Sequence, residues 1–427
     1  MLLGVAREKI TPEIGGQLYG YNPDVRSTSL ADDLTVTTFY FVDGDKKALL
    51  ITATVCLINT GYAIELLERV SKESGIDKSN IILAATHTHS GPNMAGTTGW
   101  GDIDMKYCEE IFAPKLSASV KAAMANPVKV KMAAVTGESK LGINRRELYD
   151  NNYLALGQNP WGPYDPTMTL LSFADESGTV VANLIHYGCH GTCAGVNTEI
   201  TRDWSGVMTD AVEDKSGAIT AFFNGPEGDV GPRISNGKTV GDLSYVYELG
   251  KVAAKDAVKL FDKLGSFEEV SLKTHSGEIK VPMASRISLE EAEALYKKYE
   301  IETVNSGAMI KAYALSVIEA HKNGEPEIEY TGFTQNLIAL GNFVFASTPY
   351  ELFSAIGMRT DRHFKDLKIL NLSNSNGSEG YFVTEEAIPL GGYEVSMFLY
   401  GQSQPYCKFA DFELFKAMVK NIENLED

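Results

Sequence analysis

Short apolar runs alternate with longer stretches in which apolar residues recur every three to four positions, along most of the 427 residues. An apolar run of four to eight residues is typical of a buried strand, and the longer period is typical of an amphipathic helix. The alternation predicts an α/β unit with a largely buried sheet. The predicted strands are 48–54, 81–86, 180–187, 219–223, 342–346 and 368–372, and the predicted helices are 63–72, 107–125, 243–263 and 352–364.

The segment 288–324 predicts a helical pair that forms a lid or an insertion on the main body. It opens with Ser288-Leu-Glu-Glu291, a capping box in which the serine and the second glutamate satisfy the first helical turn reciprocally. No low-complexity linker and no internal repeat interrupts the chain, so no domain boundary is predicted.

The excess of acidic residues excludes several classes of partner. The chain has 56 Asp and Glu against 38 Lys and Arg, a formal net charge of −18, which repels nucleic acid and anionic membrane surfaces. Nowhere do 18 apolar residues follow one another, and Arg7 interrupts the N-terminal apolar stretch. We therefore expect a soluble chain without a transmembrane segment or a secretory leader. The compartment and the oligomeric state stay open.

Five cysteines are too few and too scattered for a disulfide framework. Cys189 and Cys193 are the most plausible pair, and together with His190 they also allow a zinc site. No second cysteine pair has the spacing of structural zinc sites, so the favoured interpretation is that the cysteines are small buried hydrophobic residues.

Polar residues that can carry chemistry follow directly after five of the predicted strands. In open α/β sheets, ligands bind beyond the carboxyl ends of the strands. Four of the seven histidines lie in these endings. The endings are Thr86-His87-Thr88-His89-Ser90-Gly91-Pro92, His186-Tyr-Gly-Cys-His190-Gly191-Thr192, Asn224-Gly-Pro-Glu227-Gly228-Asp229, Ser347-Thr348-Pro349-Tyr350-Glu351 and Gly377-Ser-Glu-Gly380-Tyr381.

His87 and His89 stand two residues apart, so on an extended backbone both side chains face the same side. Two imidazoles placed in this way can share a metal, or one can bind the metal while the other handles a proton or a substrate oxygen. The alternative is a polar strand end with solvated histidines, although the Ser-Gly-Pro turn that follows favours a site.

Three further candidates also have a plain structural interpretation. His190 can be a core histidine whose ring is bonded to a backbone carbonyl. Glu351 fits the third position of a helix that begins with Thr348 as N-cap and Pro349 at the first position, which makes it a capping residue. Tyr381 by itself is a buried or surface tyrosine.

Together these motifs resemble the N-terminal catalytic domain of the neutral/alkaline (non-lysosomal) ceramidase family. The Thr-His-Thr-His-Ser-Gly-Pro motif at 86–92 is highly specific, and the others add weight through their order and spacing along almost the whole chain. They are Gly4-Val-Ala-Arg-Glu-Lys-Ile-Thr-Pro12, Gly142-Ile-Asn-Arg145, His190-Gly-Thr192, Gly228-Asp-Val230, Pro349-Tyr-Glu351, Tyr381 and Tyr393-Glu394. The resemblance implies mixed β-sheets layered with helices over residues 1–427, and the family's C-terminal immunoglobulin-like domain is expected to be absent.

The resemblance implies a zinc-dependent hydrolase that cleaves the amide bond of an N-acyl substrate, such as a ceramide-like lipid, with a zinc-activated water. Carried over position by position, the metal ligands would be His87, His190, Glu351 and Tyr381. His89 would lie beside the metal and bind the substrate or transfer a proton. Tyr381 would also stabilise the oxyanion, and Arg145 and Tyr393 would line the scissile amide. Proteins of this family are often secreted or periplasmic.

One position departs from the family pattern. Where the family has Gly-Asp-Val-Ser-Pro, this chain has Gly231 in place of the serine. Glycine has no hydroxyl, so a serine nucleophile at this position is excluded, and the loss argues against ceramide itself as the substrate. A mechanism whose nucleophile is a metal-activated water survives the change. Glu227, directly before the motif, and Asp229, its second residue, are candidates for orienting metal ligands.

Two other functions are compatible with the same residues. A zinc-dependent esterase, lactonase or deacetylase would use the same chemistry on a sugar or another small polar metabolite, and a non-catalytic relative would bind metal without turnover. A serine hydrolase is disfavoured because the chain has no Gly-x-Ser-x-Gly elbow. Nucleotide chemistry is disfavoured because no glycine-rich phosphate cradle follows a strand.

Overall fold

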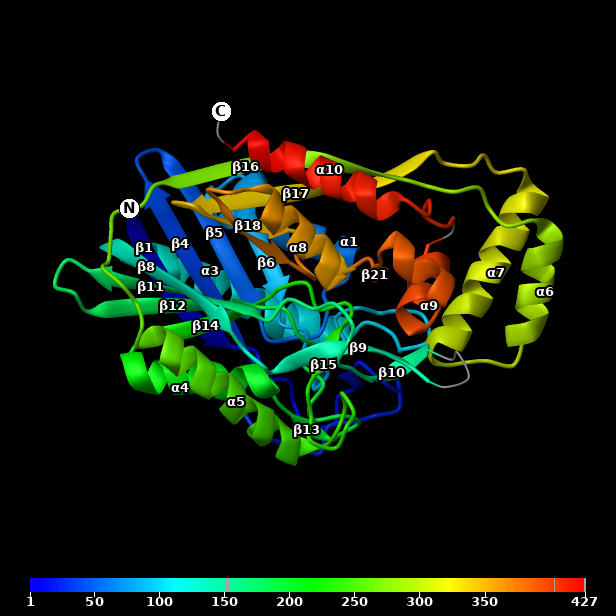
Figure 1. Cartoon of the computed structure of the whole chain (residues 1–427), viewed down its shortest axis with the longest axis horizontal. Coiled ribbons are helices and arrows are strands. Elements are labelled where there is room, and N and C mark those ends of the chain that lie inside the picture. Colours follow the sequence, from blue (N-terminus) through cyan, green and yellow to red (C-terminus); the bar gives the residue numbers. More distant parts are fainter. Residues whose placement is uncertain (150–153, 403, 426–427) are drawn as a thin grey trace.

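Helices and mixed sheets are layered on one another, which confirms the predicted fold class (Figure 1). The computed structural model describes residues 1–149, 154–402 and 404–425. The main sheet contains β1 (Leu2–Lys9), β4 (Thr35–Asp43), β5 (Lys46–Ala53), β6 (Ile81–Ala85), β8 (Val128–Glu138), β11 (Thr167–Asp175), β12 (Val180–Tyr187) and β14 (Ile219–Asn224). Its strand order is β14-β12-β11-β8-β1-β4-β5-β6.

A second sheet packs against one face of the main sheet. It contains β16 (Leu272–Pro282), β17 (Tyr330–Leu340), β18 (Phe343–Ser347) and β20 (Lys368–Leu372), in the order β16-β17-β18-β20. Side chains that point inward from both sheets fill the space between them, among them Phe39 and Phe41 of β4, Phe345 of β18 and Leu370 of β20. One buried cluster therefore joins the N-terminal and C-terminal halves of the chain.

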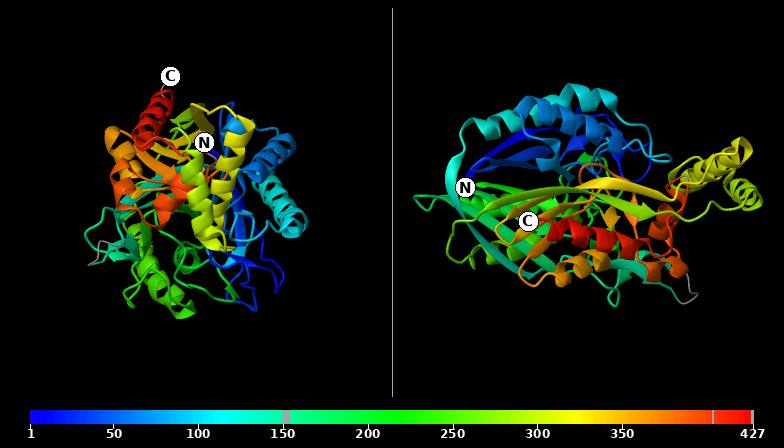
Figure 2. Two further views of the ribbon diagram at one scale, coloured as in Figure 1. Left: turned by 90° about the vertical axis from the view of Figure 1, so that its right-hand side faces the viewer. Right: turned by 90° about the horizontal axis from the view of Figure 1, so that it is seen from above.

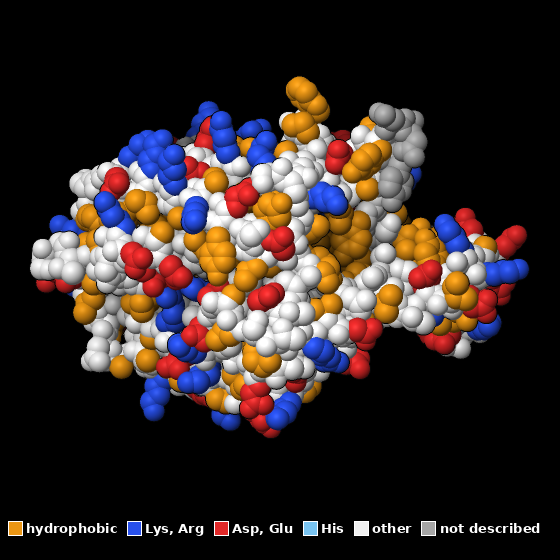
Figure 3. Space-filling model, turned by 90° about the horizontal axis from the view of Figure 1, so that it is seen from below, with side chains coloured by type: hydrophobic (Ala, Val, Ile, Leu, Met, Phe, Trp, Pro, Cys, Tyr) orange, Lys and Arg blue, Asp and Glu red, His pale blue; other side chains and the backbone are white. Residues whose placement is uncertain are grey.

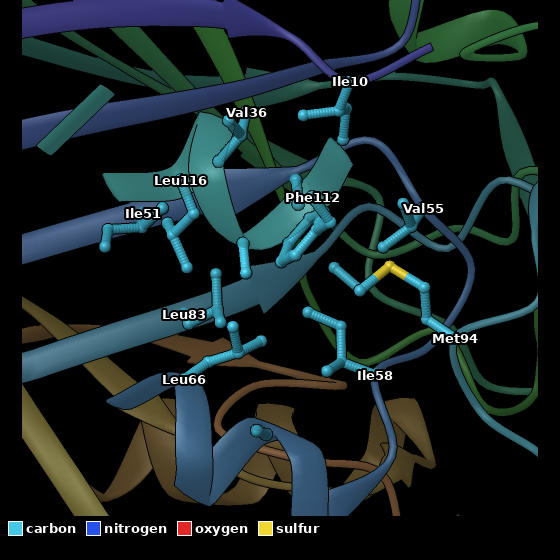
Figure 4. Packing of buried hydrophobic residues seen from close by; sticks show 14 of the residues in the cluster. Ile10, Val36, Ile51, Val55, Ile58, Leu66, Leu83, Met94, Phe112 and Leu116 are labelled. Carbon is cyan, nitrogen blue, oxygen red and sulfur yellow. The ribbon is translucent and has the colours of Figure 1, made fainter. Parts of the chain in front are cut away.

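Helices cover the outer faces of both sheets. They are α1 (Thr60–Ser74), α3 (Ala113–Ala125), α4 (Trp204–Ser216), α5 (Leu243–Phe261), α8 (Ser354–His363) and α10 (Ala410–Glu423). The first two pack over the β4–β6 half of the main sheet, α4 and α5 pack over its β11–β14 half, and α8 and α10 cover the second sheet. Figure 4 shows the first of these contacts, in which Ile51 and Leu83 of the sheet pack with Leu66 of α1 and Leu116 of α3.

Parallel pairing joins β5 to β6, β12 to β14 and β18 to β20. These are the strands predicted from apolar runs, because a parallel strand that is buried on both faces is apolar throughout. The carboxyl ends of these strands lead into the loops that carry the candidate site residues.

Two predicted helices differ from the structure in their bounds. The stretch 352–364 is helical only from Ser354, because Glu351–Leu352 form the short strand β19, which pairs with β21 (Tyr381–Phe382). The stretch 107–125 is divided into α2 (Met105–Tyr107), the π-helical turn η2 (Cys108–Phe112) and α3. The helices α4, α9 (Tyr393–Tyr400) and α10 were not predicted.

Two helices, α6 (Leu289–Tyr299) and α7 (Asn305–Asn323), lie side by side and project from one end of the body (Figure 2). The capping box predicted at Ser288 and Glu291 is present. Tyr313 of α7 packs against Tyr400 of α9, with ring centroids 5.1 Å apart. That this pair is an insertion on the main body remains a prediction.

Short elements complete the described part of the chain. They are β2 (Leu18–Tyr19), β3 (Ser29–Leu30), β7 (Gly91–Pro92), β9 (Gly142–Leu148), β10 (Leu154–Asn159), β13 (Glu199–Ile200), β15 (Val230–Pro232), η1 (Lys78–Asn80) and η3 (Glu385–Leu390). Cys189 and Cys193 are free and buried, so the disulfide considered for them is not formed. Among the described residues, every helix is too short or too polar to traverse a lipid bilayer.

Candidate active site

Loops that follow the parallel strands meet at one end of the main sheet. A β-bridge between Thr88 and Gly191 joins the loop after β6 to the loop after β12. The amide of His89 also donates to the carbonyl oxygen of Gly191 over 3.0 Å. Nearby, the register of β19 and β21 places Glu351 opposite Tyr381. The backbone thus brings together residues from four distant segments.

His87 turns its imidazole toward this end through an unusual backbone conformation. Its φ is +67°, a left-handed value that non-glycine residues rarely adopt. The extended backbone expected for the His87–His89 pair is therefore wrong, although the two rings still meet, with centroids 4.9 Å apart. Nδ1 of His87 lies 3.1 Å from the carbonyl oxygen of Cys56. With its proton on Nδ1, the ring presents the Nε2 lone pair to the site.

His190 is held in the same way. Its Nδ1 lies 2.9 Å from the carbonyl oxygen of Glu227 and 3.1 Å from that of Val230, so the expected bond to backbone carbonyls exists on one side of the ring. On the other side, Nε2 lies 3.0 Å from Oε2 of Glu351. Burial and the nearby Arg145 lower the pKa of His190 to about 3. The imidazole is therefore neutral at pH 7, and its Nε2 lone pair is available to a cation.

Glu351 supplies a buried carboxylate rather than a helix cap. The helix α8 begins only at Ser354, so the capping interpretation of Glu351 is wrong. Its Oε2 lies 3.0 Å from Nε2 of His190 and 3.4 Å from Nε2 of His87. No donor from the described residues forms a hydrogen bond to this oxygen. A buried acceptor without a donor is costly, and a bound cation removes the cost.

The donor set fits a divalent metal ion. His87, His190 and Glu351 offer ligand atoms that lie within 4.8 Å of one another. Both imidazoles direct Nδ1 at backbone carbonyls, so two nitrogen lone pairs and a carboxylate oxygen face the same point. Ligands held tetrahedrally at about 2.1 Å from zinc are roughly 3.4 Å from one another. The separations of 3.0 and 3.4 Å in this site are close to that value.

Tyr381 lies beside these ligands and is oriented by a buried ion-pair network. Its hydroxyl is 3.3 Å from Nε2 of His190 and accepts a hydrogen bond from Arg145 over 2.9 Å. Arg145 and Arg146 both bind the carboxylate of Glu394, over 2.9 and 2.7 Å, and that carboxylate is 0% exposed. Arg145 therefore reaches the site through Tyr381, and it is not among the residues that line the cavity.

His89 and Tyr393 lie on the cavity side of these groups. Nε2 of His89 is 3.2 Å from Nε2 of His87, and its Nδ1 has no partner among the described residues. Gly20 leaves room for this ring, because a Cβ at Gly20 would stand 2.3 Å from Nδ1 of His89. The ring of Tyr393 stands edge-on to that of Tyr381, with centroids 5.6 Å apart. Both side chains are accessible to a molecule in the cavity.

A buried amide and a buried carboxylate stand behind His87. Asn374 donates to Oε1 of Glu227 over 2.6 Å, and its Nδ2 lies 3.3 Å from Nδ1 of His87. Burial raises the pKa of Glu227 to about 8. Sequence reasoning named Glu227 but missed Asn374. The signal that would have found it is the polar run Ser373-Asn374-Ser375-Asn376 directly after a buried strand.

Gly231 lies outside the cavity wall. It pairs with Ile143 in β15 and β9, and a Cβ at this position would stand 2.7 Å from Cβ of Thr239. A serine here would therefore point at Thr239. Two residues earlier, Asp229 accepts a hydrogen bond from the amide of Ser354 over 2.7 Å, and burial raises its pKa to about 6.

His87, Glu351 and Tyr381 form part of the wall of a cavity of about 230 Å³, and His190 lies behind that wall. Polar groups on the wall include Thr97, Thr98, Ser378, Glu379 and Gln402, and apolar groups include Leu57, Trp100, Met309 of α7 and Met397 of α9. Figure 3 shows that the face seen from below is hollowed beside the projecting α6–α7 pair, with hydrophobic side chains in the hollow.

Comparison with known proteins finds one family model along most of the chain. Residues 1–306 match the model described as neutral/alkaline non-lysosomal ceramidase, N-terminal. Neutral ceramidase B of Dictyostelium discoideum is 27% identical over 226 residues, which are 48% of this chain and 31% of that protein. The neutral ceramidase of Pseudomonas aeruginosa is 25% identical over 203 residues, 44% of this chain and 30% of that protein. The matched region thus spans about a third of the length of these curated relatives.

Solved structures share the fold over nearly the whole chain. The crystal structure of neutral ceramidase from Pseudomonas aeruginosa superposes with a TM-score of 0.73 and 18% identity, covering 99% of this chain and 75% of that one. A ceramidase complexed with C2 superposes with a TM-score of 0.74 and 17% identity, covering 100% and 75%. Similarity at this level of identity establishes the common fold.

Proposed function

Because the chain belongs to the neutral/alkaline non-lysosomal ceramidase family, we propose that it is a zinc-dependent hydrolase of the amide bond in an N-acyl substrate. The observation that carries the proposal is the convergence of His87, His190 and Glu351, whose ligand atoms lie within 4.8 Å of one another in a buried site. The names of the matched relatives, which are neutral ceramidases, support an N-acyl lipid or a smaller N-acyl compound as the substrate class.

His87, His190 and Glu351 would hold the zinc ion, with the hydroxyl of Tyr381 beside them. Zinc in such a site lowers the pKa of a coordinated water from 15.7 to about 7 and polarises a carbonyl group. The backbone carbonyls that bind Nδ1 of both imidazoles fix the rings with Nε2 directed at the site. The carboxylate of Glu351 offsets one of the two positive charges.

Tyr381 would donate its hydroxyl hydrogen to the amide oxygen as negative charge develops there. The hydrogen bond that it accepts from Arg145 polarises the hydroxyl and makes it a stronger donor. A preorganised donor of this kind contributes about 3–4 kcal/mol to the stability of the transition state. Arg145 acts here through Tyr381, and Tyr393 would position the substrate against the ring of Tyr381.

His89 would transfer the proton to the leaving amine. Its Nε2 lies at the metal side, 3.2 Å from Nε2 of His87, and its Nδ1 has no partner among the described residues. One nitrogen can therefore accept a proton while the other releases one. Gly231 supplies no group to this scheme, because it lies outside the cavity wall.

Replacement of His190 by alanine tests the centre. We expect His190→Ala to lose bound zinc, measured by elemental analysis of the purified protein. Because the metal is lost with its ligand, the rate of hydrolysis of N-acyl substrates should fall at least about a thousandfold. His363→Ala, on an exposed face of α8, is the matched control and should retain both properties. Full activity of the metal-free protein would refute the proposal.

The size of the cavity favours a second candidate function. A volume of about 230 Å³ with polar groups on its wall also fits an O-acyl ester of a small polar metabolite, because zinc-activated water attacks esters as well as amides. Matched N-acyl and O-acyl compounds, assayed side by side, separate the two activities. Tight zinc binding without turnover of either series would identify a non-catalytic relative.

The α6–α7 pair, within residues 288–324, belongs in our proposal to the same catalytic unit as an insertion. Met309 of α7 contributes to the cavity wall together with residues of the main body, which supports this assignment.

A further inference from the structure

Few apolar side chains close the cavity beside the candidate metal ligands. Its volume of about 230 Å³ lies below the roughly 300–1,000 Å³ of pockets that bind drug-sized ligands. Apart from tyrosines and the small Cys56, the apolar part of the wall consists of Leu57, Trp100, Met309 and Met397. These four side chains belong to one small cluster or pack against it, so the apolar surface is short.

The helix α7 closes this apolar end. Met309 and Trp100 are each only 6% exposed, because they pack into the same cluster. A hydrogen bond from the amide of Asn305 to the carbonyl oxygen of Gly99, 2.7 Å long, ties the start of α7 to the loop that carries Trp100. Met309 is therefore a fixed part of the wall in the described structure.

A larger cavity of about 480 Å³ lies next to the same segment of chain. Glu379 contributes to the walls of both cavities. The amide of Ser378 donates to the hydroxyl of Thr60 over 3.1 Å, and the amide of Glu379 donates to the carbonyl oxygen of Pro349 over 2.6 Å. These bonds anchor the segment that borders both cavities, so a chain bound at the metal site would have to displace this segment to enter the second volume.

The polar part of the wall selects against negative charge. Hydroxyl, amide and carboxylate groups line it, and no described Lys or Arg does. Glu379 lies there with its carboxylate bonded to Gln402 over 3.1 Å. The guanidinium of Arg145, behind Tyr381, is already paired with Glu394. Apart from the proposed zinc ion, a substrate carboxylate would find no counter-charge in this cavity, whereas hydroxyl groups would find partners.

We propose that the substrate is a small amide in which an acyl group of a few carbons is joined to a hydroxylated amine without negative charge, and that Met309 sets the limit on acyl length. This inference rests on the proposed amide hydrolysis and narrows its substrate class. Each methylene that the cavity can bury adds about fourfold to affinity, and methylenes beyond Met309 add nothing or collide with it.

The acyl limit can be measured on the zinc-loaded protein. We propose a series of N-acyl derivatives of 2-amino-1,3-propanediol with acetyl, butanoyl, hexanoyl, octanoyl and hexadecanoyl groups, the longest presented in detergent micelles. We expect kcat/KM to peak at or below hexanoyl and to fall at least tenfold by hexadecanoyl. A maximum at hexadecanoyl would overturn the inference while leaving amide hydrolysis standing. Hydrolysis of none of the series would overturn the proposed function and this inference with it.

Variants on one helix test the role of Met309. Met309→Ala should raise the ratio of octanoyl to acetyl hydrolysis at least fivefold, because it lengthens the apolar end of the cavity. Leu315→Ala removes an exposed leucine from the same helix and should leave the ratio unchanged. An unchanged ratio in Met309→Ala, with the protein folded by circular dichroism, would remove Met309 from the proposal.

A matched pair of substrates tests the charge rule. N-butanoylserine differs from N-butanoyl-2-amino-1,3-propanediol by a carboxylate in place of a hydroxymethyl group. We expect kcat/KM for the carboxylate to be at least tenfold lower, mainly through a higher KM. Equal or faster hydrolysis of N-butanoylserine would contradict the charge rule.

Discussion

Each imidazole of the candidate centre is fixed from behind by groups that bind its second nitrogen. For His190 these groups are the carbonyl oxygens of Glu227 and Val230. For His87 the group is the carbonyl oxygen of Cys56, and the side-chain amide of Asn374 packs beside the same nitrogen at 3.3 Å. Such partners set the tautomer and the angle of the ring, so they govern how well a metal is held.

The carboxyl group of Glu227 anchors one of these partners. Glu227→Ala removes the acceptor of Asn374 and should lower zinc affinity about 10–100-fold, as measured by competition with a chromophoric chelator. Glu227→Gln keeps an oxygen at the same place and should lower the affinity much less. Equal losses in the two variants, or no loss in either, would contradict a positioning role.

The buried carboxyl group of Asp229 should make stability depend on pH. Its folded pKa of about 6 lies above the usual 3.8, so the folded state holds the proton more tightly than the unfolded state between these values. The group therefore contributes stability below about pH 4 that is lost as the pH rises through 6. Asparagine does not titrate.

As the pH rises from 4 to 7, the free energy of unfolding of the wild type should therefore fall by about 2–3 kcal/mol relative to that of Asp229→Asn. Urea denaturation at both pH values measures this. The asparagine variant loses one oxygen that accepts hydrogen bonds from Ser354 and Asn144. This loss changes the stability equally at both pH values, so it does not mask the trend. A difference that is constant with pH would show that Asp229 ionises normally in the fold.

Residue types and spacing identified most of the groups at the site, but not the local geometry that delivers them. Glu351 illustrates the gap. Its local sequence fits a helix start, yet pairing with Tyr381 across β19 and β21 makes the segment a strand. His87 shows the same limit, because its left-handed backbone depends on contacts with another loop. Both are tertiary effects that override local preference.

Among the elements, the loops after β6 and β12 depend on one close contact. A Cβ at Gly191 would stand 2.8 Å from the carbonyl oxygen of His87 and 3.0 Å from Cα of Thr88. The two loops can therefore approach closely enough to bridge only because residue 191 has no side chain.

Gly191→Ala should push these loops apart. We expect the free energy of unfolding to fall by about 1–3 kcal/mol and zinc affinity to fall with it, because the two histidines lie on opposite sides of the contact. Calorimetry and zinc titration measure the two effects. Gly265→Ala, where a Cβ meets nothing within 4 Å, is the control. A variant that keeps wild-type zinc affinity would show that the loops are positioned by other contacts.

Burial on both faces separates the strands that the sequence predicted from those that it missed. The six predicted strands are those in the parallel pairs β5–β6, β12–β14 and β18–β20, which are buried on both faces and hence apolar throughout. Antiparallel strands with a partly exposed face, such as β8 and β16, interrupt their apolar residues with polar ones. Apolar runs alone therefore located the strands that end at the site and missed much of the scaffold around them.

At the scale of the whole molecule, the candidate centre joins distant parts of the chain. His87 and His190 lie on loops that follow strands of the main sheet, and Glu351 lies in β19, which pairs with β21. An ion bound there would cross-link these parts of the chain in the folded state only, so metal binding should stabilise the fold as a unit.

Zinc should accordingly raise the melting temperature. At a free zinc concentration 100 times Kd, the expected stabilisation is about 2.7 kcal/mol, visible as an upward shift of Tm that grows with zinc concentration in scanning calorimetry. His190→Ala should show no such shift, and His363→Ala should shift as the wild type does. A Tm that is indifferent to zinc in the wild type would argue against a centre of this kind.

The α6–α7 pair supplies Met309 to the cavity wall but none of the candidate metal ligands. If both proposals hold, the groups that carry out the reaction and the group that selects the substrate lie on different parts of the chain. During evolution, this helical pair could then be trimmed, extended or replaced while the candidate metal ligands stay unchanged. Related proteins with this fold could in that case differ in their substrates more than in the reaction that they catalyse.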